Sequence, residues 1–131
     1  MKDKEFVPGD WIKRCDEYLR VISVNHLSGE VFLDQDGRGV MEKLSNIEPV
    51  PLTVDILERN NIPRRFDNLW KMNEWKNDSL RLWIGSDGYI LGDIYGKKGK
   101  NTQTHVYSIF TYVHELQHAI AVCNAPQEIT L

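Results

Sequence analysis

The segment Pro49-Val50-Pro51 divides this sequence more sharply than any other stretch. Proline cannot donate a hydrogen bond to a neighbouring strand and pushes the preceding residue into extended geometry, so a sheet that reaches this segment ends there. Strand patterns precede the segment, and mixed helix and strand patterns follow it. We therefore expect an α+β protein with two lobes, residues 1–50 and residues 51–131. The sequence leaves open whether the lobes fold as one cooperative unit.

The first lobe reads as short strands separated by turns, such as Asn25 to Gly29. Close, regular spacing of this kind is typical of a small closed or half-open barrel, and its order predicts an SH3-like barrel. Asp34, Asp36 and Gly37 suggest a calcium loop, but such a loop needs glycine at its sixth position and an acidic residue at its twelfth. Here glycine is fourth and Ser45 is twelfth. We expect a hairpin turn instead.

The second lobe is expected to be a helix–β-hairpin–helix unit that packs on the barrel. Thr53 is a suitable N-cap for a helix over residues 54–59. Residues 80–84 and 89–94 flank an Asp-Gly turn and predict the hairpin. Residues 64–78 have rough helical spacing, and residues 104–108 suit a third strand. An apolar stripe predicts the last helix over residues 109–123.

Charge and cysteine content limit the expected partners and the expected cellular compartment of the protein. The formal net charge of −3 argues against coating nucleic acid by bulk electrostatics, although a local basic patch is compatible with it. Cys15 and Cys123 are far apart and make no disulfide framework, so we expect both to be reduced. A charged N-terminal stretch and the lack of a long apolar run predict a cytoplasmic protein that is not a membrane protein.

The predicted last helix carries the motif H-E-x-x-H at His114, Glu115 and His118. Two histidines one helical turn apart share a face and suit a tetrahedral zinc ion, with the glutamate as general base. A catalytic zinc site needs a third protein ligand, and His105 on the preceding strand is the candidate. At 100° per residue, both motif histidines lie nearly opposite the apolar stripe, so we expect them to face solvent. The alternative to a zinc hydrolase is a packing helix without cofactor, and we favour it.

Three segments of the chain resemble a group of small proteins from phages and mobile elements of gut bacteria. These segments are Gly9-Asp10-Trp11, then Pro49-Val50-Pro51-Leu52-Thr53 before Leu57-Glu58, and then Tyr112-Val113-His114 before Leu116-Gln117. The group has no established function, so the resemblance implies a phage-associated setting and no activity. In the relatives the last segment usually reads Tyr-Val-His-Gln-Leu-Gln-Asn. Glu115 and His118, which complete the zinc motif, are therefore where this chain departs from the group.

The sequence favours an accessory or binding protein without enzymatic activity over a zinc hydrolase. Aromatic and basic residues occur together near residue 65 and again in a glycine-lysine loop after Tyr95. Such residues stack on bases and pair with phosphates, although core aromatics beside solvated lysines have the same composition. The partner is expected to be a protein or a nucleic acid, and the oligomeric state is left open. The candidate binding residues are Arg64, Arg65, Trp70, Lys97, Lys98 and Lys100.

Overall fold

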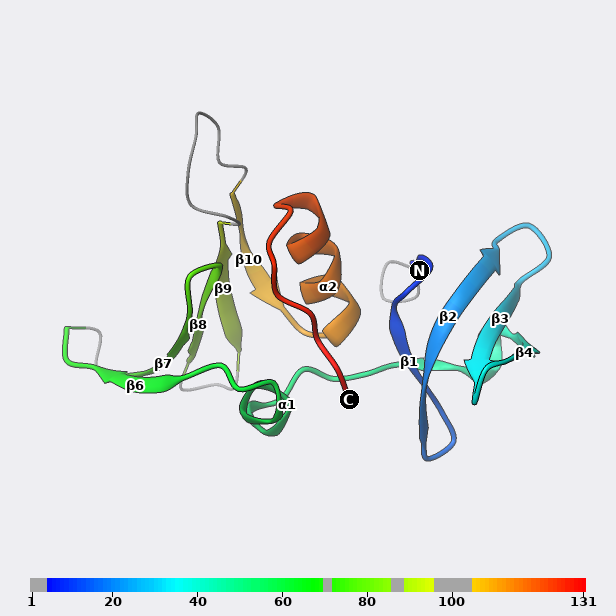
Figure 1. The fold of residues 1–131 in the computed structure, drawn as a ribbon, viewed down its shortest axis with the longest axis horizontal. Coiled ribbons are helices and arrows are strands. Elements are labelled where there is room, and N and C mark those ends of the chain that lie inside the picture. Colours follow the sequence, from blue (N-terminus) through cyan, green and yellow to red (C-terminus); the bar gives the residue numbers. More distant parts are fainter. Residues whose placement is uncertain (1–4, 70–71, 86–88, 96–104) are drawn as a thin grey trace. The chain divides into compact units, whose positions relative to one another are not determined.

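The computed structural model describes residues 5–69, 72–85, 89–95 and 105–131 and has a mixed α+β fold (Figure 1). Most elements are strands, and they form two five-stranded antiparallel sheets. The chain groups into two compact units, Met1–Pro51 with Tyr112–His114, and Leu52–Thr111 with Glu115–Leu131. The α+β class expected from the sequence is thus the class observed.

The sheet of the first unit has the strand order β4-β3-β2-β1-β5, so the last strand returns to pair with the first. Within the described residues the two edge strands, β4 and β5, are not paired with each other, so the sheet does not close into a barrel. The SH3-like barrel therefore stays a prediction. The elements are β1 (Trp11–Arg14), β2 (Glu17–Asn25), β3 (Glu30–Gln35), β4 (Arg38–Lys43), a 3₁₀ turn (Leu44–Asn46) and β5 (Glu48–Pro49).

The turns of the first unit follow from their residue types. Asp36 and Gly37 join β3 to β4 and both have positive φ, 53° and 85°, as a two-residue type I′ hairpin requires. The Asp34 carboxylate accepts a hydrogen bond of 2.8 Å from the Gly37 amide. The hairpin prediction for this segment is confirmed. Inside the sheet lies an apolar core made of Phe6, Ile12, Leu19, Val21, Val31, Leu33 and Ile47.

The second unit is built on a five-stranded sheet in the order β10-β9-β8-β7-β6. The expected hairpin is present as β8 and β9, which pair antiparallel. It is only the centre of a larger sheet, because residues 64–78, where helical spacing was noted, instead form two strands. The two strands pair antiparallel with each other, and β7 also pairs with β8. The strands are β6 (Arg64–Asp67), β7 (Met72–Lys76), β8 (Leu80–Ile84), β9 (Ile90–Ile94) and β10 (Val106–Phe110).

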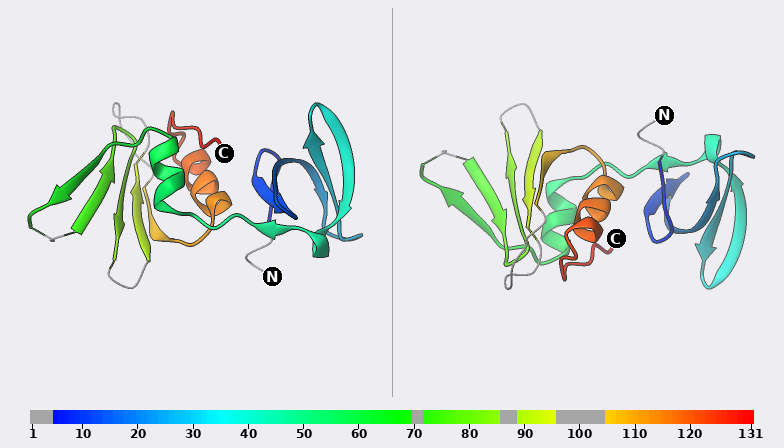
Figure 2. Two further views of the ribbon diagram at one scale, coloured as in Figure 1. Left: turned by 90° about the horizontal axis from the view of Figure 1, so that it is seen from below. Right: turned by 90° about the horizontal axis from the view of Figure 1, so that it is seen from above.

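Two helices complete the second unit. Helix α1 (Val54–Arg59) has the predicted bounds, and Thr53 Oγ1 accepts the amide of Ile56 at 3.4 Å. Helix α2 (Val113–Val122) begins later than residue 109 because Ile109 and Phe110 continue strand β10. Figures 1 and 2 show α1, the part of α2 that belongs to this unit, and the C-terminal tail on one face of the sheet. No described helix covers the opposite face, which we call the open face.

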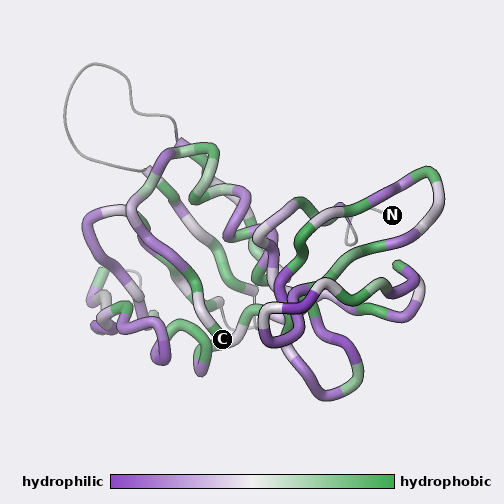
Figure 3. Tube along the Cα trace, turned by 45° about the vertical axis from the view of Figure 1, so that its right-hand side comes forward, coloured by the Kyte–Doolittle hydropathy of each residue, from purple (hydrophilic) through white to green (hydrophobic). Residues whose placement is uncertain are grey.

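Burial in the second unit agrees with this arrangement. Apolar and polar stretches alternate along its strands (Figure 3). Among the described helices, none is long and apolar enough to cross a membrane. The buried side chains of this unit come from the helices, the sheet and the tail, and they include Ile56, Leu57, Trp75, Leu80, Leu82, Ile90, Ile94, Phe110, Leu116, Ile120 and Ile129.

Candidate functional site

The glutamate of the H-E-x-x-H motif has a structural role at the start of helix α2. Glu115 Oε1 accepts a hydrogen bond of 2.8 Å from the Thr111 amide, just ahead of the helix. Amides at a helix start lack partners within the helix, and a glutamate in the first turn reaches back to satisfy one of them. The same carboxylate also lies at the positive end of the helix dipole. Glu115 is thus positioned as a capping residue.

The two motif histidines have different surroundings. His114 is 1% exposed, which corrects the expectation that both would face solvent. Its ring lies 4.8 Å from the ring of Phe6 and 5.8 Å from that of Tyr112, stacked on the latter at 16°. Helical periodicity placed His114 opposite the apolar stripe but could not reveal these aromatic contacts. His118 is half-buried.

His105, the candidate third zinc ligand, hydrogen-bonds elsewhere. Its Nδ1 lies 3.0 Å from Asp93 Oδ1. Across the part of the chain that the structure describes, no group of three His, Cys, Asp or Glu side chains is arranged to hold a metal ion. The described geometry therefore offers no third ligand beside His114 and His118, and the zinc alternative stays an untested prediction.

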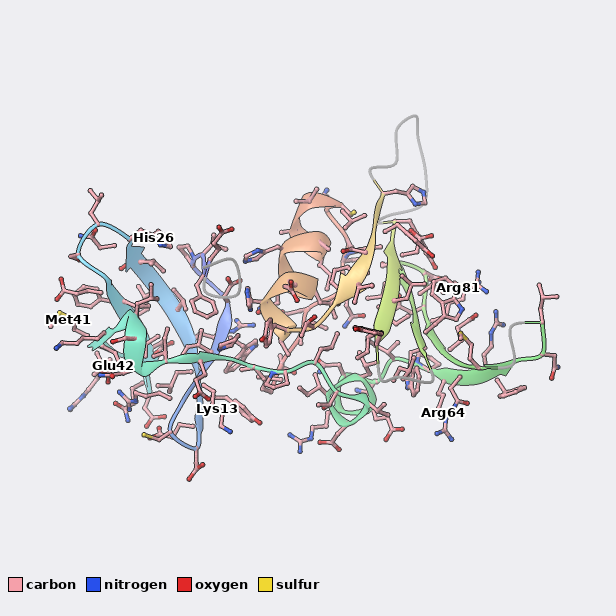
Figure 4. All side chains as sticks on the ribbon, turned by 180° about the vertical axis from the view of Figure 1, so that it is seen from behind. Lys13, His26, Met41, Glu42, Arg64 and Arg81 are labelled. Carbon is pink, nitrogen blue, oxygen red and sulfur yellow. The ribbon has the colours of Figure 1, made fainter. Side chains whose placement is uncertain are left out.

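The basic and aromatic patches predicted from the sequence are only partly described. Arg64 and Arg65 lie on the edge strand β6, and Arg64 and Arg81 both project from the sheet of the second unit (Figure 4). Arg65 is bonded to Glu74, so its charge is partly engaged. The remaining predicted residues, Trp70, Lys97, Lys98 and Lys100, lie outside the described residues.

The open face carries the best-formed site of the second unit. Leu80 and Leu82 point to the core, so their neighbours Arg81 and Trp83 lie on the open face, as alternation along a strand requires. Strand register then places side chains in two rows across the sheet. The first row is Arg65, Glu74, Trp83, Leu91 and Ile109, from β6 to β10. The second row is Lys76, Arg81, Asp93 and Tyr107, from β7 to β10.

A carboxylate between two guanidinium groups lies at the centre of this face. Glu74 is 0% exposed. Its Oε1 accepts Arg65 Nε at 3.0 Å, and its Oε2 accepts Arg81 Nε at 2.9 Å and Nη2 at 2.7 Å. Burial acts to raise the pKa of the Glu74 carboxyl, but the hydrogen bonds from Arg81 and Arg65 outweigh it and hold the pKa below its ordinary value. Glu74 is therefore ionised and fixes the direction of both arginines.

Arg81 borders a hollow on the open face. Its guanidinium lies over the Trp83 ring, 4.6 Å from the ring centre, which is a cation–π geometry. The hollow has a volume of about 370 Å³, within the range of small ligand pockets. We call it the open-face pocket. It is lined by Met72, Arg81, Trp83, Leu91 and Tyr107.

A second hollow lies in the first unit, beside the turn between β2 and β3. Its volume is about 710 Å³, and Met41 and Glu42 of β4 contribute to its wall (Figure 4). The Glu42 carboxylate is engaged locally, since it accepts hydrogen bonds from Asn46 Nδ2 at 2.9 Å and from the Lys43 amide at 3.1 Å. Most of its walls come from turns and the edge strand β4, whereas the open-face pocket spans four adjacent strands, β7 to β10. We therefore take the open-face pocket as the candidate site.

The sequence contains a signal for this pocket that is separate from its motifs. In residues 80–84, leucines alternate with an arginine and a tryptophan, so a strand with a buried face must place Arg81 and Trp83 together on its other face. Their neighbours Met72, Leu91 and Tyr107 depend on strand register, which sequence spacing does not give. Comparison with known proteins adds no family or fold, because no family model, curated protein or solved structure matches the chain.

Proposed function

We propose that this chain is a binding protein without chemistry of its own, and that the open-face pocket is where it binds. The observation that carries the proposal is the position of Arg81, held by Glu74 on one side and laid over Trp83 at the wall of an otherwise apolar hollow. A guanidinium fixed in this way loses little conformational freedom when it meets a ligand, which favours binding.

The residue types in the pocket support the same proposal. Trp, Tyr, Met and Arg are the residues enriched at the cores of binding interfaces, and Trp, Tyr and Arg dominate binding hot spots. The pocket contains one of each, with Leu91 completing its wall. Tyr107 in the pocket wall is 66% exposed and Ile109, on the same strand, is 49% exposed, so the apolar surface continues beyond the hollow. A ligand with an apolar body and one anionic group fits these walls.

A direct test uses 1-anilinonaphthalene-8-sulfonate, which combines an aromatic body with a sulfonate. Titration into ¹⁵N-labelled protein is expected to give saturable shifts of amides in β8, β9 and β10. Leu91→Asp, which places a negative charge in the pocket, is expected to weaken binding of this anionic dye about tenfold or more. Val122→Asp is the matched control, because Val122 is an exposed apolar residue of α2. The proposal would be refuted if the shifted amide signals lay outside the sheet. It would also be refuted if the two variants changed the affinity for the dye equally.

For the first unit we propose a half-open barrel of the SH3-like kind. The support is its strand order, in which β5 returns to pair with β1, and the 3₁₀ turn Leu44–Asn46 between β4 and β5. Small barrels of this kind display loops and a sheet surface that suit binding. The first unit would then be a second binding module. Amide exchange tests the arrangement, since β1, which has strands on both sides, should exchange more slowly than β4 at the sheet edge.

We also propose the kind of genetic element and the compartment in which this binding protein acts. The resemblance of residues 9–11, 49–60 and 112–117 to proteins of phages and mobile elements supports an accessory role in such an element. The two cysteines, which form no disulfide, support a cytoplasmic location. Under this proposal the partner is a macromolecule present in the infected or host cell. Co-purification from such cells tests it, with wild-type and Leu91→Asp protein compared as competitors for the captured partner.

A further inference from the structure

The described residues form two sheets whose edge strands are β4, β5, β6 and β10. Natural proteins protect such edges from pairing with other chains by short length, by proline or by charge. Three of these four strands carry protection of this kind. Strand β4 contains Arg38 and Lys43, β5 has two residues and contains Pro49, and β6 contains Arg64 and Arg65.

The fourth edge strand, β10, carries none of these protective features. Its sequence is Val-Tyr-Ser-Ile-Phe, in which four residues are β-branched or aromatic and none is charged or a proline. Its register with β9 is regular over all five residues, so no bulge turns the edge away. Among the described strands, only β9 pairs with it. Alternate residues of β10 therefore direct their N–H and C=O groups away from the sheet.

The middle of β10 is accessible on both of its faces. Tyr107 and Ile109 are exposed on the open face. Ser108 points to the opposite, helix-covered side of the sheet, as alternation requires, and it is exposed as well. Helices α1 and α2 thus leave this part of the strand uncovered. Beyond β10 the chain pairs with the linker, because the Leu52 amide donates to the Thr111 carbonyl at 2.9 Å. The edge that is open to another strand therefore consists of the five residues of β10.

The residue types of β10 follow the same order in both directions. If two copies pair antiparallel about Ser108, each Tyr107 lies opposite Ile109 of the second copy, on the open face. Aromatic residues opposite β-branched residues stabilise a sheet, and so do hydrogen bonds between facing serines. Val106 and Phe110 form a matching apolar pair on the other side. A two-fold axis places a residue against its own copy, and here that residue is uncharged.

We infer that two copies of this chain associate through β10, antiparallel and about a two-fold axis at Ser108, so that the two sheets become one. The inference goes beyond the proposed function and does not require a ligand. In the dimer, Ile109 of the second copy extends the apolar wall that Tyr107 forms in the open-face pocket. Each pocket therefore gains a residue from the other chain, and both open faces lie on the same side of the joined sheet.

The size of the contact determines how strong the dimer is expected to be. Five residues a side are far fewer than the roughly 20–30 residues a side of a standard interface. We therefore expect a reversible dimer with a dissociation constant above about 1 μM. Sedimentation velocity on the full chain, from about 1 μM to about 1 mM, measures it. A chain that stays monomeric over this range would overturn the inference, while saturable binding of the dye would still leave the proposed function standing.

The variant Ser108→Lys tests whether the axis passes through this residue. It places two ammonium groups directly opposite each other and is expected to raise the dissociation constant about tenfold or more. Ser23→Lys is the matched control, since Ser23 is also an exposed strand serine but lies on β2, inside the sheet of the first unit. If the two variants have equal effects, or if Ser108→Lys has none, the inference is wrong.

Mixing two oppositely charged variants separates loss of pairing from loss of folding. Ser108→Lys and Ser108→Glu should each dimerise poorly alone. An equimolar mixture should associate about tenfold more tightly than either variant, because opposite charges then face each other across the axis. Two misfolded proteins would not restore each other in this way. If mixing brings no gain, the proposed pairing of residue 108 with its own copy is excluded.

A disulfide provides a second, independent measure of the same contact. Directly opposite residues of antiparallel strands have Cα atoms about 4.5–5.5 Å apart, which is within the range that a disulfide spans. Ser108→Cys, in a Cys15→Ser background that removes the exposed native thiol, should therefore give a covalent dimer on mild oxidation. Ser23→Cys in the same background is the control and should remain largely monomeric. Equal yields of covalent dimer from the two variants, or none from Ser108→Cys, would overturn the inference.

Discussion

Arg81 lies over Trp83, 4.6 Å from the ring centre, while the same guanidinium bonds to the buried carboxylate of Glu74. Glu74 turns Arg81 towards β7, and Trp83 stops it from leaving the sheet surface. Because the three side chains come from adjacent strands, the cluster also fixes the register of β7 against β8. The described residues that line the open-face pocket therefore all come from strands of the sheet.

Acidification should weaken the second unit through Glu74. Because the folded-state pKa of this carboxyl is lowered from its ordinary 4.5, its stabilising contribution is present above about that pH and is lost as the pH falls through the folded-state value. Glu74→Gln should cost about 1.5–3 kcal/mol at pH 7, since it weakens bonds to two charged groups. Its deficit relative to wild type should shrink below pH 4.5. Urea unfolding at pH 7, 5 and 3.5 measures this, with Glu58→Gln as an exposed control. A deficit that does not change with pH would contradict the assignment.

Glu115 should stabilise helix α2 mainly through the hydrogen bond that its side-chain oxygen accepts. Its negative charge should contribute little to that stability. Glu115→Ala removes the acceptor for the Thr111 amide and is expected to cost about 0.5–2 kcal/mol, the usual value of a lost cap. Glu115→Gln keeps a side-chain oxygen at the same place and should cost less than about 0.5 kcal/mol. Thermal unfolding of the two variants measures the difference. A Gln variant as unstable as the Ala variant would show that the capping bond is not what Glu115 contributes.

Local features of this fold could be predicted from the sequence, whereas contacts between strands distant in sequence could not. Thr53 and the turn at Asp36 and Gly37 were identified because capping and positive φ depend on adjacent residues only. The helical spacing noted in residues 64–78 was a wrong guide, because apolar residues at this spacing fit a helix and a strand alike. Only the pairing of these residues with each other and with β8 decides between the two. The Glu74 cluster and the burial of His114 both depend on residues brought together by register or by packing, which a one-dimensional period does not contain.

Gly92 leaves room for Phe110, and a methyl group there should disturb the core. A Cβ at residue 92 would lie 2.5 Å from Phe110 Cε2 and 2.6 Å from Leu82 Cδ2. Gly92→Ala should therefore cost about 1–3 kcal/mol by overpacking. The matched control is Gly39→Ala, where the nearest atom, Ile22 Cδ1, is at 3.8 Å and no strain is expected. In a double mutant, Phe110→Leu should relieve part of the cost, so the two effects should not add. Additive losses in urea unfolding would rule out the predicted clash.

Asn60 should hold the C-terminal tail against helix α1. Its Nδ2 donates to the Thr130 carbonyl at 3.0 Å, and its Oδ1 accepts the Thr130 amide at 2.8 Å, so one side chain pairs with the tail as a strand would. Ile129, next to this pair, is 2% exposed and seals the core. Asn60→Ala should thus cost about 1–2 kcal/mol, because it removes these two bonds to the tail and the bond from Nδ2 to the Ile56 carbonyl at 2.8 Å, and the Thr130 amide should exchange faster with solvent. Asn73→Ala, at an exposed residue of β7, is the control and should change stability by less than about 0.5 kcal/mol. If the Thr130 amide stays as protected in Asn60→Ala as in wild type, burial of Ile129 alone fixes the tail, and Ile129→Ala should then release it.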